Sequence, residues 1–235
     1  MKINFEFNEE FYSLPFYVDN RVLIPRNDTE ILVEKAIKEI DLIGKNIILI
    51  DVGTGSSCIL TAILKNIRFD LINSFGLDIS LDALEVAKIN IEKHNLENKT
   101  ILLNSDLLEI FLNNYSIFPF SKGELEGVYE NKTIIITANL PYIKDGDFEN
   151  IDKNVLENEP HIALFGGEKT GFELYEKLIG QIFDLKKIYK QNIILFIEIG
   201  FDQYYYSREF LQNLGLKFEY FKDLNGINRC VKIIF

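Results

Sequence analysis

The chain has 235 residues, of which 47% are apolar and 26% are charged, as is typical of a globular protein. This composition excludes wholesale disorder, collagen-like repeats and a disulfide-stapled miniprotein. The formal net charge is −11, and so acidic a surface repels nucleic-acid phosphates and anionic lipid. No cluster of Lys and Arg offsets this charge, so we expect neither nucleic acid nor a membrane as a partner.

Cysteine usage and the N-terminus indicate the compartment. Cys58 and Cys230 are the two cysteines, and neither belongs to a CxxC pair, so we expect two reduced, buried thiols. The first residues include acids and lack a continuous apolar stretch, which argues against a signal peptide. No apolar run approaches the roughly 18 residues of a membrane-spanning helix. We therefore expect a soluble, cytoplasmic protein, and with His94 and His161 far from any cysteine we expect no metal site.

Short apolar runs alternate with helical patterns along the chain, which predicts a parallel sheet wound with helices. Ser80 is the predicted N-cap of one of these helices. In chain order we expect a strand or hairpin over Phe11–Leu23, a helix over Asp28–Ile40, a strand over Asn46–Asp51, a helix over Cys58–Ile67, a strand over Asp70–Asp78, a helix over Leu81–His94, strands over Thr100–Asn104 and Thr133–Ala138, a helix over Phe172–Leu185, a strand over Asn192–Ile199 and a helix over Tyr204–Leu214.

The C-terminal part of the chain predicts an antiparallel end to this sheet. Lys217–Leu224 and Ile227–Phe235 are extended segments joined at Asn225-Gly226, a dipeptide that favours a tight hairpin turn. A plain dinucleotide-binding domain does not usually end this way. Glu109–Lys132 is a long polar and aromatic connection of unknown role. We expect one globular unit, with an N-terminal strand or hairpin segment over residues 1–27 and the main domain over residues 28–235.

A glycine turn and an acid predict a nucleotide-like cofactor. Asp51-Val-Gly-Thr-Gly-Ser-Ser57 follows a predicted strand and opens a helix, so its glycines allow close approach and its N–H groups suit an anion. Asp78 closes the next predicted strand, where a carboxylate accepts hydrogen bonds from ribose hydroxyls. An adenosine-containing cofactor fits both features. NAD and S-adenosylmethionine remain open at this point, but Cys58 breaks the full GxGxxG pattern and the terminal hairpin favours a methyltransferase sheet.

The four residues Asn139-Leu140-Pro141-Tyr142 directly follow the predicted strand Thr133–Ala138. An amide or aromatic-amine nitrogen is a poor nucleophile, because its lone pair is delocalised, so it must be held in line with its N–H groups polarised. The Asn139 side-chain oxygen and the Leu140 carbonyl can each accept one N–H, and Pro141 keeps Leu140 extended. Tyr142 offers a flat face to a planar group. Since a sulfonium is already activated, positioning does most of the work, and we predict Asn139, Pro141 and Tyr142 as catalytic residues.

Several further motifs lie in a fixed order along the chain. They are Phe11–Arg26 followed by Asn27-Asp28-Thr29-Glu30, Asp78-Ile79-Ser80 with Ala83-Leu84 and Ala87, Ser105-Asp106, Glu159-Pro160 with Ala163-Leu164 and Gly166-Gly167 through Gly171, Glu198-Ile199-Gly200 with Gln203, and Asp223-Leu224 with Gly226 and Arg229. Together with the glycine turn and the Asn-Leu-Pro-Tyr motif, they resemble the bacterial peptide chain release factor glutamine methyltransferases, the PrmC/HemK family. The resemblance covers about residues 11 to 235.

The resemblance implies a fold and a reaction. The fold is the Rossmann-like class I S-adenosylmethionine-dependent methyltransferase fold, a mostly parallel seven-stranded sheet with a C-terminal antiparallel hairpin. The reaction transfers a methyl group from S-adenosylmethionine to the side-chain amide nitrogen of the glutamine in the Gly-Gly-Gln motif of peptide chain release factors, in translation termination. The release factor is then the protein substrate.

The resemblance also assigns residue roles by position. Gly53, Thr54, Gly55, Ser56 and Ser57 would hold the methionine end of the cofactor. Asp78 would bind the ribose, Asp106 and Leu107 would line the adenine, and Asn139 would lie near the cofactor. Asn139, Leu140, Pro141 and Tyr142 would bind the substrate glutamine. Arg26 and Thr29 would help to close the pocket, and Glu198 is expected to have a structural or supporting role.

The chain also departs from the family pattern. Leu140 stands where the family usually has Pro, which makes the motif similar to that of ribosomal RNA adenine dimethylases, and Ser57 replaces the usual last glycine of the glycine motif. The family's N-terminal helical domain is not seen in this sequence, so docking would rely on the catalytic domain, on Glu109–Lys132 or on a partner. Two alternatives stay open: an adenine-N6 methyltransferase acting on RNA or DNA, and a catalytically silent cofactor-binding scaffold. The net charge opposes the first, and retention of Gly53, Asp78 and the Asn139 motif opposes the second.

Overall fold

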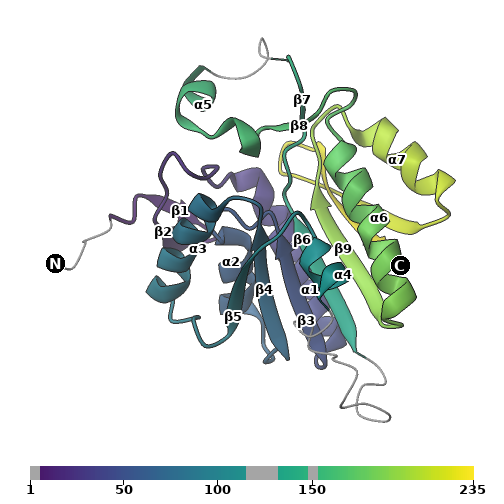
Figure 1. Cartoon of the computed structure of the whole chain (residues 1–235), viewed down its shortest axis with the longest axis horizontal. Coiled ribbons are helices and arrows are strands. Elements are labelled where there is room, and N and C mark those ends of the chain that lie inside the picture. Colours follow the sequence, from purple (N-terminus) through teal and green to yellow (C-terminus); the bar gives the residue numbers. More distant parts are fainter. Residues whose placement is uncertain (1–5, 115–131, 148–152) are drawn as a thin grey trace.

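A central sheet organises the molecule, for which the computed structural model describes residues 6–114, 132–147 and 153–235. The sheet has seven strands in the order β10-β11-β9-β6-β3-β4-β5 (Figure 1). The strands that run parallel are β3 (Ile47–Val52), β4 (Asn73–Asp78), β5 (Thr100–Asn104), β6 (Thr133–Ala138) and β9 (Asn192–Glu198). β11 (Asn228–Ile234) is antiparallel to both β9 and β10 (Lys217–Lys222). The expected mostly parallel sheet with its C-terminal antiparallel hairpin is confirmed.

Helices cover both faces of this sheet (Figure 1). α1 (Glu30–Ile43), α2 (Cys58–Asn66) and α3 (Leu81–Lys93) bury apolar residues in one core cluster. α4 (Glu109–Asn113), α6 (Glu173–Ile188) and α7 (Tyr204–Asn213) contribute to the other. Within β3, Ile48 and Ile50 belong to one cluster, whereas Ile47 and Leu49 belong to the opposite one. Burial on both faces explains why the central strands β3, β6 and β9 are nearly continuous apolar runs and do not alternate with polar residues.

A short hairpin precedes this core. β1 (Glu9–Phe11) pairs antiparallel with β2 (Leu14–Phe16). The hairpin is shorter than the expected Phe11–Leu23, because Tyr12 and Ser13 both adopt positive φ and turn the chain immediately. A 3-10 turn, η1 (Asn27–Thr29), then leads into α1.

Other predicted boundaries also need correction. The strand expected over Asp70–Asp78 begins at Asn73, because the Asp70 side chain stays 90% exposed and pairs with Lys99 at the surface. The connection expected over Glu109–Lys132 begins with α4, and residues 115–131 of it lie outside the described residues. Ser80 caps α3 as predicted, since its hydroxyl accepts a hydrogen bond from the Ala83 N–H at 3.2 Å.

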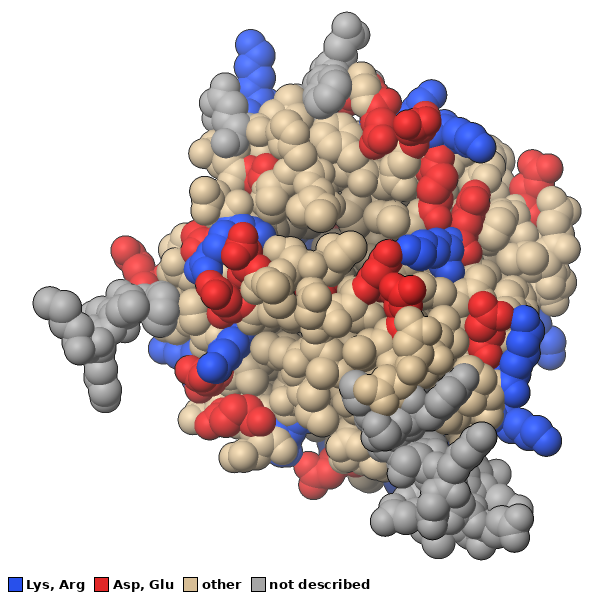
Figure 2. All heavy atoms as spheres, in the orientation of Figure 1, with Lys and Arg blue, Asp and Glu red and all other residues tan. Residues whose placement is uncertain are grey.

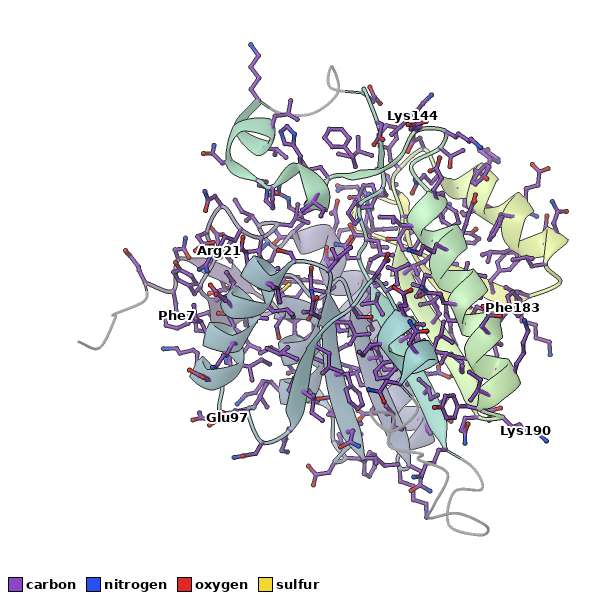
Figure 3. All side chains as sticks on the ribbon, in the orientation of Figure 1. Phe7, Arg21, Glu97, Lys144, Phe183 and Lys190 are labelled. Carbon is purple, nitrogen blue, oxygen red and sulfur yellow. The ribbon has the colours of Figure 1, made fainter. Side chains whose placement is uncertain are left out.

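A small structure of short elements covers the end of the sheet where β6 ends (Figure 1), and Lys144, labelled in Figure 3, belongs to it. It comprises β7 (Ile143–Lys144), α5 (Lys153–Asn158), the 3-10 turn η3 (His161–Ala163) and β8 (Phe165–Gly167), with β7 and β8 paired. No sequence pattern predicted these elements, because each is too short to show a period.

The two cysteines are buried and unpaired, which agrees with the expectation of buried thiols. None of the described helices has the length and apolar character needed to span a membrane. Within residues 6–114, 132–147 and 153–235, no group of three or more His, Cys, Asp or Glu side chains is arranged to hold a metal ion.

Candidate active site

A cavity of about 280 Å³ opens where the parallel strands β3, β4, β5 and β6 end. In open α/β sheets, ligands bind at this edge. The predicted site residues that line the cavity are Gly53, Thr54, Gly55, Ser56, Asp78, Asp106, Leu107, Asn139, Leu140 and Pro141. Two predicted residues, Ser57 and Tyr142, are not among the lining residues. The fold therefore brings together most of the residues that the sequence singled out.

The glycine turn after β3 forms one wall of the cavity. Gly53 and Gly55 both have positive φ, at 69° and 52°. A Cβ on Gly53 would lie only 2.8 Å from the Leu140 side chain, so glycine lets the turn approach the Asn-Leu-Pro-Tyr segment. Ser57, at the N-cap of α2, has φ of 66°, in the left-handed region that favours glycine. Its hydroxyl contacts Thr61 at 3.1 Å and it is fully buried, so Ser57 supports the turn from behind the cavity.

Asp51, near the end of β3, connects this turn to the neighbouring strand β6. Its carboxylate accepts hydrogen bonds from the hydroxyls of Thr54 and Thr137, both at 2.7 Å. Burial raises the pKa of Asp51 to about 6, although these two hydrogen bonds oppose the shift. The sequence marked Asp51 only as the first residue of the glycine motif. A polar residue inside an otherwise apolar strand was the signal for this role.

Asp78, the predicted ribose-binding acid, lines the cavity at the end of β4. Oδ2 accepts a hydrogen bond from the Gly55 N–H and Oδ1 accepts one from the Ser80 N–H, both at 2.9 Å. Burial raises the pKa of the carboxyl group above its ordinary value. The same side chain thus holds the glycine turn in place and faces the cavity.

The loop after β5 brings Asp106 and Leu107 to the cavity. Leu107 has a positive φ of 53°. Helix α6 fixes this loop, because Lys177 pairs with the Asp106 carboxylate at 2.5 Å and Gln181 accepts a hydrogen bond from the Leu108 N–H at 2.7 Å. Sequence reasoning missed Lys177 and Gln181, which lie on the polar positions of an amphipathic helix.

Hydrogen bonds fix two polar groups of the Asn-Leu-Pro-Tyr segment that follows β6, the Asn139 side-chain amide and the Leu140 backbone N–H. The Asn139 Nδ2 donates to the Thr29 hydroxyl at 3.2 Å. The Leu140 N–H donates at 3.0 Å to the hydroxyl of Tyr175, which donates at 2.5 Å to the Glu198 carbonyl. Tyr175 is fully buried in α6, and nothing in the helical pattern distinguished it from a core aromatic residue.

Tyr142 occupies a different position from the one expected for a flat face in the pocket. It is not among the lining residues, and its hydroxyl donates to Glu198 Oε1 at 3.2 Å. Burial and the nearby Glu198 charge raise the pKa of Tyr142.

Gly166 in β8 and Gly171 after it pack directly against the Asn-Leu-Pro-Tyr backbone. A Cβ on Gly166 would lie 2.2 Å from the Pro141 carbonyl oxygen. A Cβ on Gly171 would lie 2.2 Å from the Tyr142 carbonyl oxygen, and Gly171 has φ of 71°. Only glycine allows this approach, so the Gly-Gly-through-Gly stretch of the sequence acts as a backbone support for the predicted catalytic segment.

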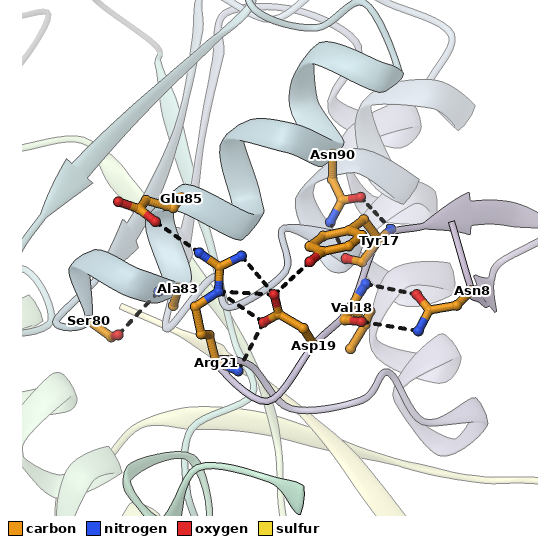
Figure 4. Close-up of polar contacts among 9 residues, drawn as sticks. All are labelled: Asn8, Tyr17, Val18, Asp19, Arg21, Ser80, Ala83, Glu85 and Asn90. Atoms are coloured by element: carbon orange, nitrogen blue, oxygen red, sulfur yellow. Dashed lines mark hydrogen bonds and ion pairs between the residues drawn. The ribbon is translucent and has the colours of Figure 1, made fainter. Parts of the chain in front are cut away.

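The segment between β2 and η1 forms another wall of the cavity, and side chains of α3 hold it (Figure 4). Asn90 accepts the Tyr17 N–H at 2.7 Å and donates to the Tyr17 and Ser56 carbonyls, each at 2.9 Å. Arg21, labelled in Figure 3, pairs with Asp19 and with Glu85. Asn90 thus connects this wall to the glycine turn.

A further ion pair, between Arg26 and the buried Glu159, joins this wall to the segment after α5. Arg26 and Thr29 both line the cavity, at the positions where they were expected to help close it.

Comparison with known proteins gives the following relatives. No family profile matches the chain. The release factor glutamine methyltransferase of Clostridium acetobutylicum is 35% identical over 223 residues, which is 94% of this chain and 70% of that protein. Among solved structures, a catalytic domain of hMettl16 in complex with a MAT2A 3'UTR hairpin superposes with a TM-score of 0.62 at 16% identity, covering 95% of this chain and 76% of that one.

A further solved structure is a release factor-specific protein-(glutamine-N5) methyltransferase from Alicyclobacillus acidocaldarius. It has a TM-score of 0.50 at 22% identity and covers 93% of this chain and 98% of that one. At these identities both structures establish a shared fold, that of the class I methyltransferases.

Proposed function

The chain belongs to the release factor glutamine methyltransferase family of S-adenosylmethionine-dependent methyltransferases, and from this we propose that it methylates the glutamine side chain of a peptide chain release factor. The methyl group would come from S-adenosylmethionine, and the acceptor would be the amide nitrogen of the glutamine in the Gly-Gly-Gln motif. The observation that carries this proposal is that Asn139 and Leu140 both line the cavity, with the Asn139 Nδ2 already bonded to Thr29.

The Asn139 side-chain oxygen and the Leu140 carbonyl suit an amide that carries two N–H groups. The Asn139 Nδ2 is directed to Thr29, which leaves Oδ1 for the cavity. Tyr175 gives its single proton to the Glu198 carbonyl at 2.5 Å, so the Leu140 carbonyl, 3.4 Å from the same hydroxyl, keeps its capacity to accept. A primary amide held by these two oxygens would have both N–H groups occupied and its nitrogen facing the methyl donor, so that positioning supplies the catalysis.

The remaining lining residues support the cofactor assignment. The glycine turn and its helix N-terminus would take the methionine end, and Asp78 would accept hydrogen bonds from the ribose. Asp106 and Leu107 would flank the adenine. S-adenosylmethionine supplies the electrophilic methyl group when it is bound, and the residues of this chain orient the acceptor nitrogen and exclude water from it.

Methylation of adenine in a nucleic acid is the alternative, because an aromatic amine also carries two N–H groups. On the face drawn in Figure 2, basic and acidic side chains are interspersed and no continuous basic patch is seen. The net charge of −11 also opposes phosphate binding. The likeness to an RNA-bound methyltransferase domain extends to the fold alone.

Methyl transfer from labelled S-adenosylmethionine tests the proposal. The purified chain is incubated with a bacterial release factor, with the same factor in which the motif glutamine is replaced by alanine, and with an adenine-containing RNA. We expect label on the unaltered release factor alone. Label on the RNA, or equal label on both release factors, would overturn the proposed substrate.

A further inference from the structure

A chain of buried polar groups lies directly behind Asn139. It begins at Glu198, at the end of β9, and passes through Thr29 of η1 to the Asn139 amide. Glu198 and Thr29 are each 2% exposed. The Asn139 Nδ2 donates to Thr29 Oγ1 at 3.2 Å. The Thr29 hydroxyl lies near the Glu198 carboxylate and lowers its pKa, as a donor to the charged form does. Glu198 does not line the cavity, so it acts on Asn139 only through Thr29.

The direction of each hydrogen bond in this chain follows from the proton count. An ionised carboxylate can only accept, and a threonine hydroxyl has a single proton. Once that proton is directed to Glu198, the Thr29 oxygen can only accept from Asn139. The amide nitrogen must then face Thr29 and the amide oxygen must face the cavity. An amide has nearly the same shape in both orientations, so these hydrogen bonds, and not packing, distinguish the two.

We propose that Glu198 and Thr29 are positioning residues that orient the Asn139 amide so that its oxygen, and not its NH₂ group, meets the acceptor nitrogen of the substrate. The inference rests on the proposed function, since it concerns a substrate nitrogen that carries N–H groups. With the amide reversed, its NH₂ group would face the N–H groups of the substrate, and donor would oppose donor.

The same carboxylate also holds the end of the catalytic segment. Glu198 Oε1 accepts a hydrogen bond from the Tyr142 hydroxyl at 3.2 Å. Glu198 Oε2 is buried and has no hydrogen-bond partner among the described residues, so it offers a free acceptor position to the nearby Thr29 hydroxyl. One buried carboxylate therefore supports the first and the last residue of Asn-Leu-Pro-Tyr.

The charge of Glu198 controls this arrangement. Burial raises its pKa, whereas the Thr29 hydrogen bond, the Arg229 charge and the Tyr142 hydroxyl lower it. Arg229 is the cation of the cluster and is paired with Asp28 at 3.3 Å. The titratable and charged groups around Glu198 are Arg229 and Cys230 on β11, Tyr142 on the catalytic segment, Asp28 on η1 and Tyr175 on α6.

The expected pH dependence follows from the direction of the shift. Above its raised pKa, Glu198 is ionised and accepts the Thr29 proton. As the pH falls through that pKa, the carboxyl group gains a proton that it can donate to Thr29, and the Thr29 proton is then free to turn to the Asn139 oxygen. The reversed amide becomes possible, so kcat should fall on the acidic side, beginning at a higher pH than an ordinary glutamate would cause.

Substitutions that add or remove single hydrogen-bonding groups test the proposal. Wild-type turnover of the release factor is measured first, followed by Thr29→Val, Thr29→Ser and Glu198→Gln. Thr29→Val should lower kcat roughly 10- to 100-fold, with little change in S-adenosylmethionine affinity measured by calorimetry. Thr29→Ser keeps the hydroxyl and should restore most of the lost rate. Glu198→Gln should remove the acidic limb of the kcat profile.

A matched control is Thr100→Val, since Thr100 is also buried and hydrogen-bonded through its hydroxyl, to Ser74, but lies at the start of β5 outside the cavity lining. We expect a wild-type kcat for this variant. Equal kcat for Thr29→Val and wild type, equal losses in the Val and Ser variants, or an unaltered acidic limb in Glu198→Gln would each overturn the proposal.

A second measurement separates this proposal from the proposed function. If the wild-type protein does not methylate the release factor, the proposed function fails. The orientation of the Asn139 side-chain amide can still be tested, by following its NH₂ signals in nuclear magnetic resonance spectra. Their loss in Asn139→Ala identifies them. A shift of these signals in Thr29→Val, but not in Thr100→Val, supports the positioning role, and unchanged signals in both contradict it.

Discussion

Removing the Tyr175 hydroxyl tests whether its hydrogen bonds fix the Asn-Leu-Pro-Tyr segment. This oxygen accepts the Leu140 N–H at 3.0 Å and donates to the Glu198 carbonyl at 2.5 Å, and the side chain is fully buried. Tyr175→Phe removes both hydrogen bonds without changing the ring. Each lost bond that leaves a buried backbone group unpaired costs about 1 to 1.5 kcal/mol, so the free energy of unfolding should fall by about 2 to 3 kcal/mol.

Urea unfolding measures this change, provided the slope of free energy against urea stays constant. The variant should also lose catalytic rate, because the Leu140 carbonyl is no longer held in place. Tyr205→Phe is the matched control, since Tyr205 is 80% exposed and its substitution should change stability by less than about 0.5 kcal/mol. Equal stability of the Tyr175 and Tyr205 variants would refute the role given to the buried hydroxyl.

Three further substitutions address the walls of the cavity. Gly166→Ala should abolish methyl transfer, because its Cβ would lie 2.2 Å from the Pro141 carbonyl. Gly180→Ala is the matched control on α6, where a Cβ would meet open space, and it should be neutral or stabilising by up to about 1 kcal/mol. Similar activity of the two variants would argue against the contact between Gly166 and the Pro141 backbone as a support of the site. Asn139→Ala should lower kcat at least roughly 100-fold while the unfolding midpoint is kept, and turnover at the wild-type rate would exclude the assigned role. Asp78→Ala should weaken S-adenosylmethionine binding by about 2 to 3 kcal/mol in calorimetry, and unchanged affinity would move the ribose site elsewhere.

Much of the sheet could be predicted because its signals are local. The apolar runs of β3, β6 and β9 and the Ser80 cap each depend on residues adjacent in the chain. The hairpin at the end of the sheet was also predicted, but its connection spans residues 223–227 and is longer than the tight turn expected at Asn225-Gly226. The Asn-Leu-Pro-Tyr motif could likewise be selected as a candidate, because it consists of four consecutive residues, and three of them line the cavity. The short elements α4 and α5 escaped prediction because they span fewer than two helical turns.

The supporting residues of the site could not be predicted, because their partners lie far away in the chain. Asn90 contacts Tyr17 and Ser56, Tyr175 contacts Leu140, and Thr137 contacts Asp51. Each of these side chains lies within an ordinary helix or strand pattern, and only the fold reveals its partner. The hydrogen bond that holds the Tyr142 hydroxyl likewise goes to Glu198, which lies 56 residues away in the sequence.

The most direct measurement of the proposed reaction is to locate the transferred methyl group. A release factor treated with the protein and S-adenosylmethionine is digested, and the peptide containing Gly-Gly-Gln is fragmented in a mass spectrometer. We expect a single added methyl group on the side-chain nitrogen of the glutamine, absent when Asn139→Ala replaces the wild-type protein. An unmodified glutamine, in a sample where calorimetry shows that S-adenosylmethionine binds, would contradict the assigned substrate.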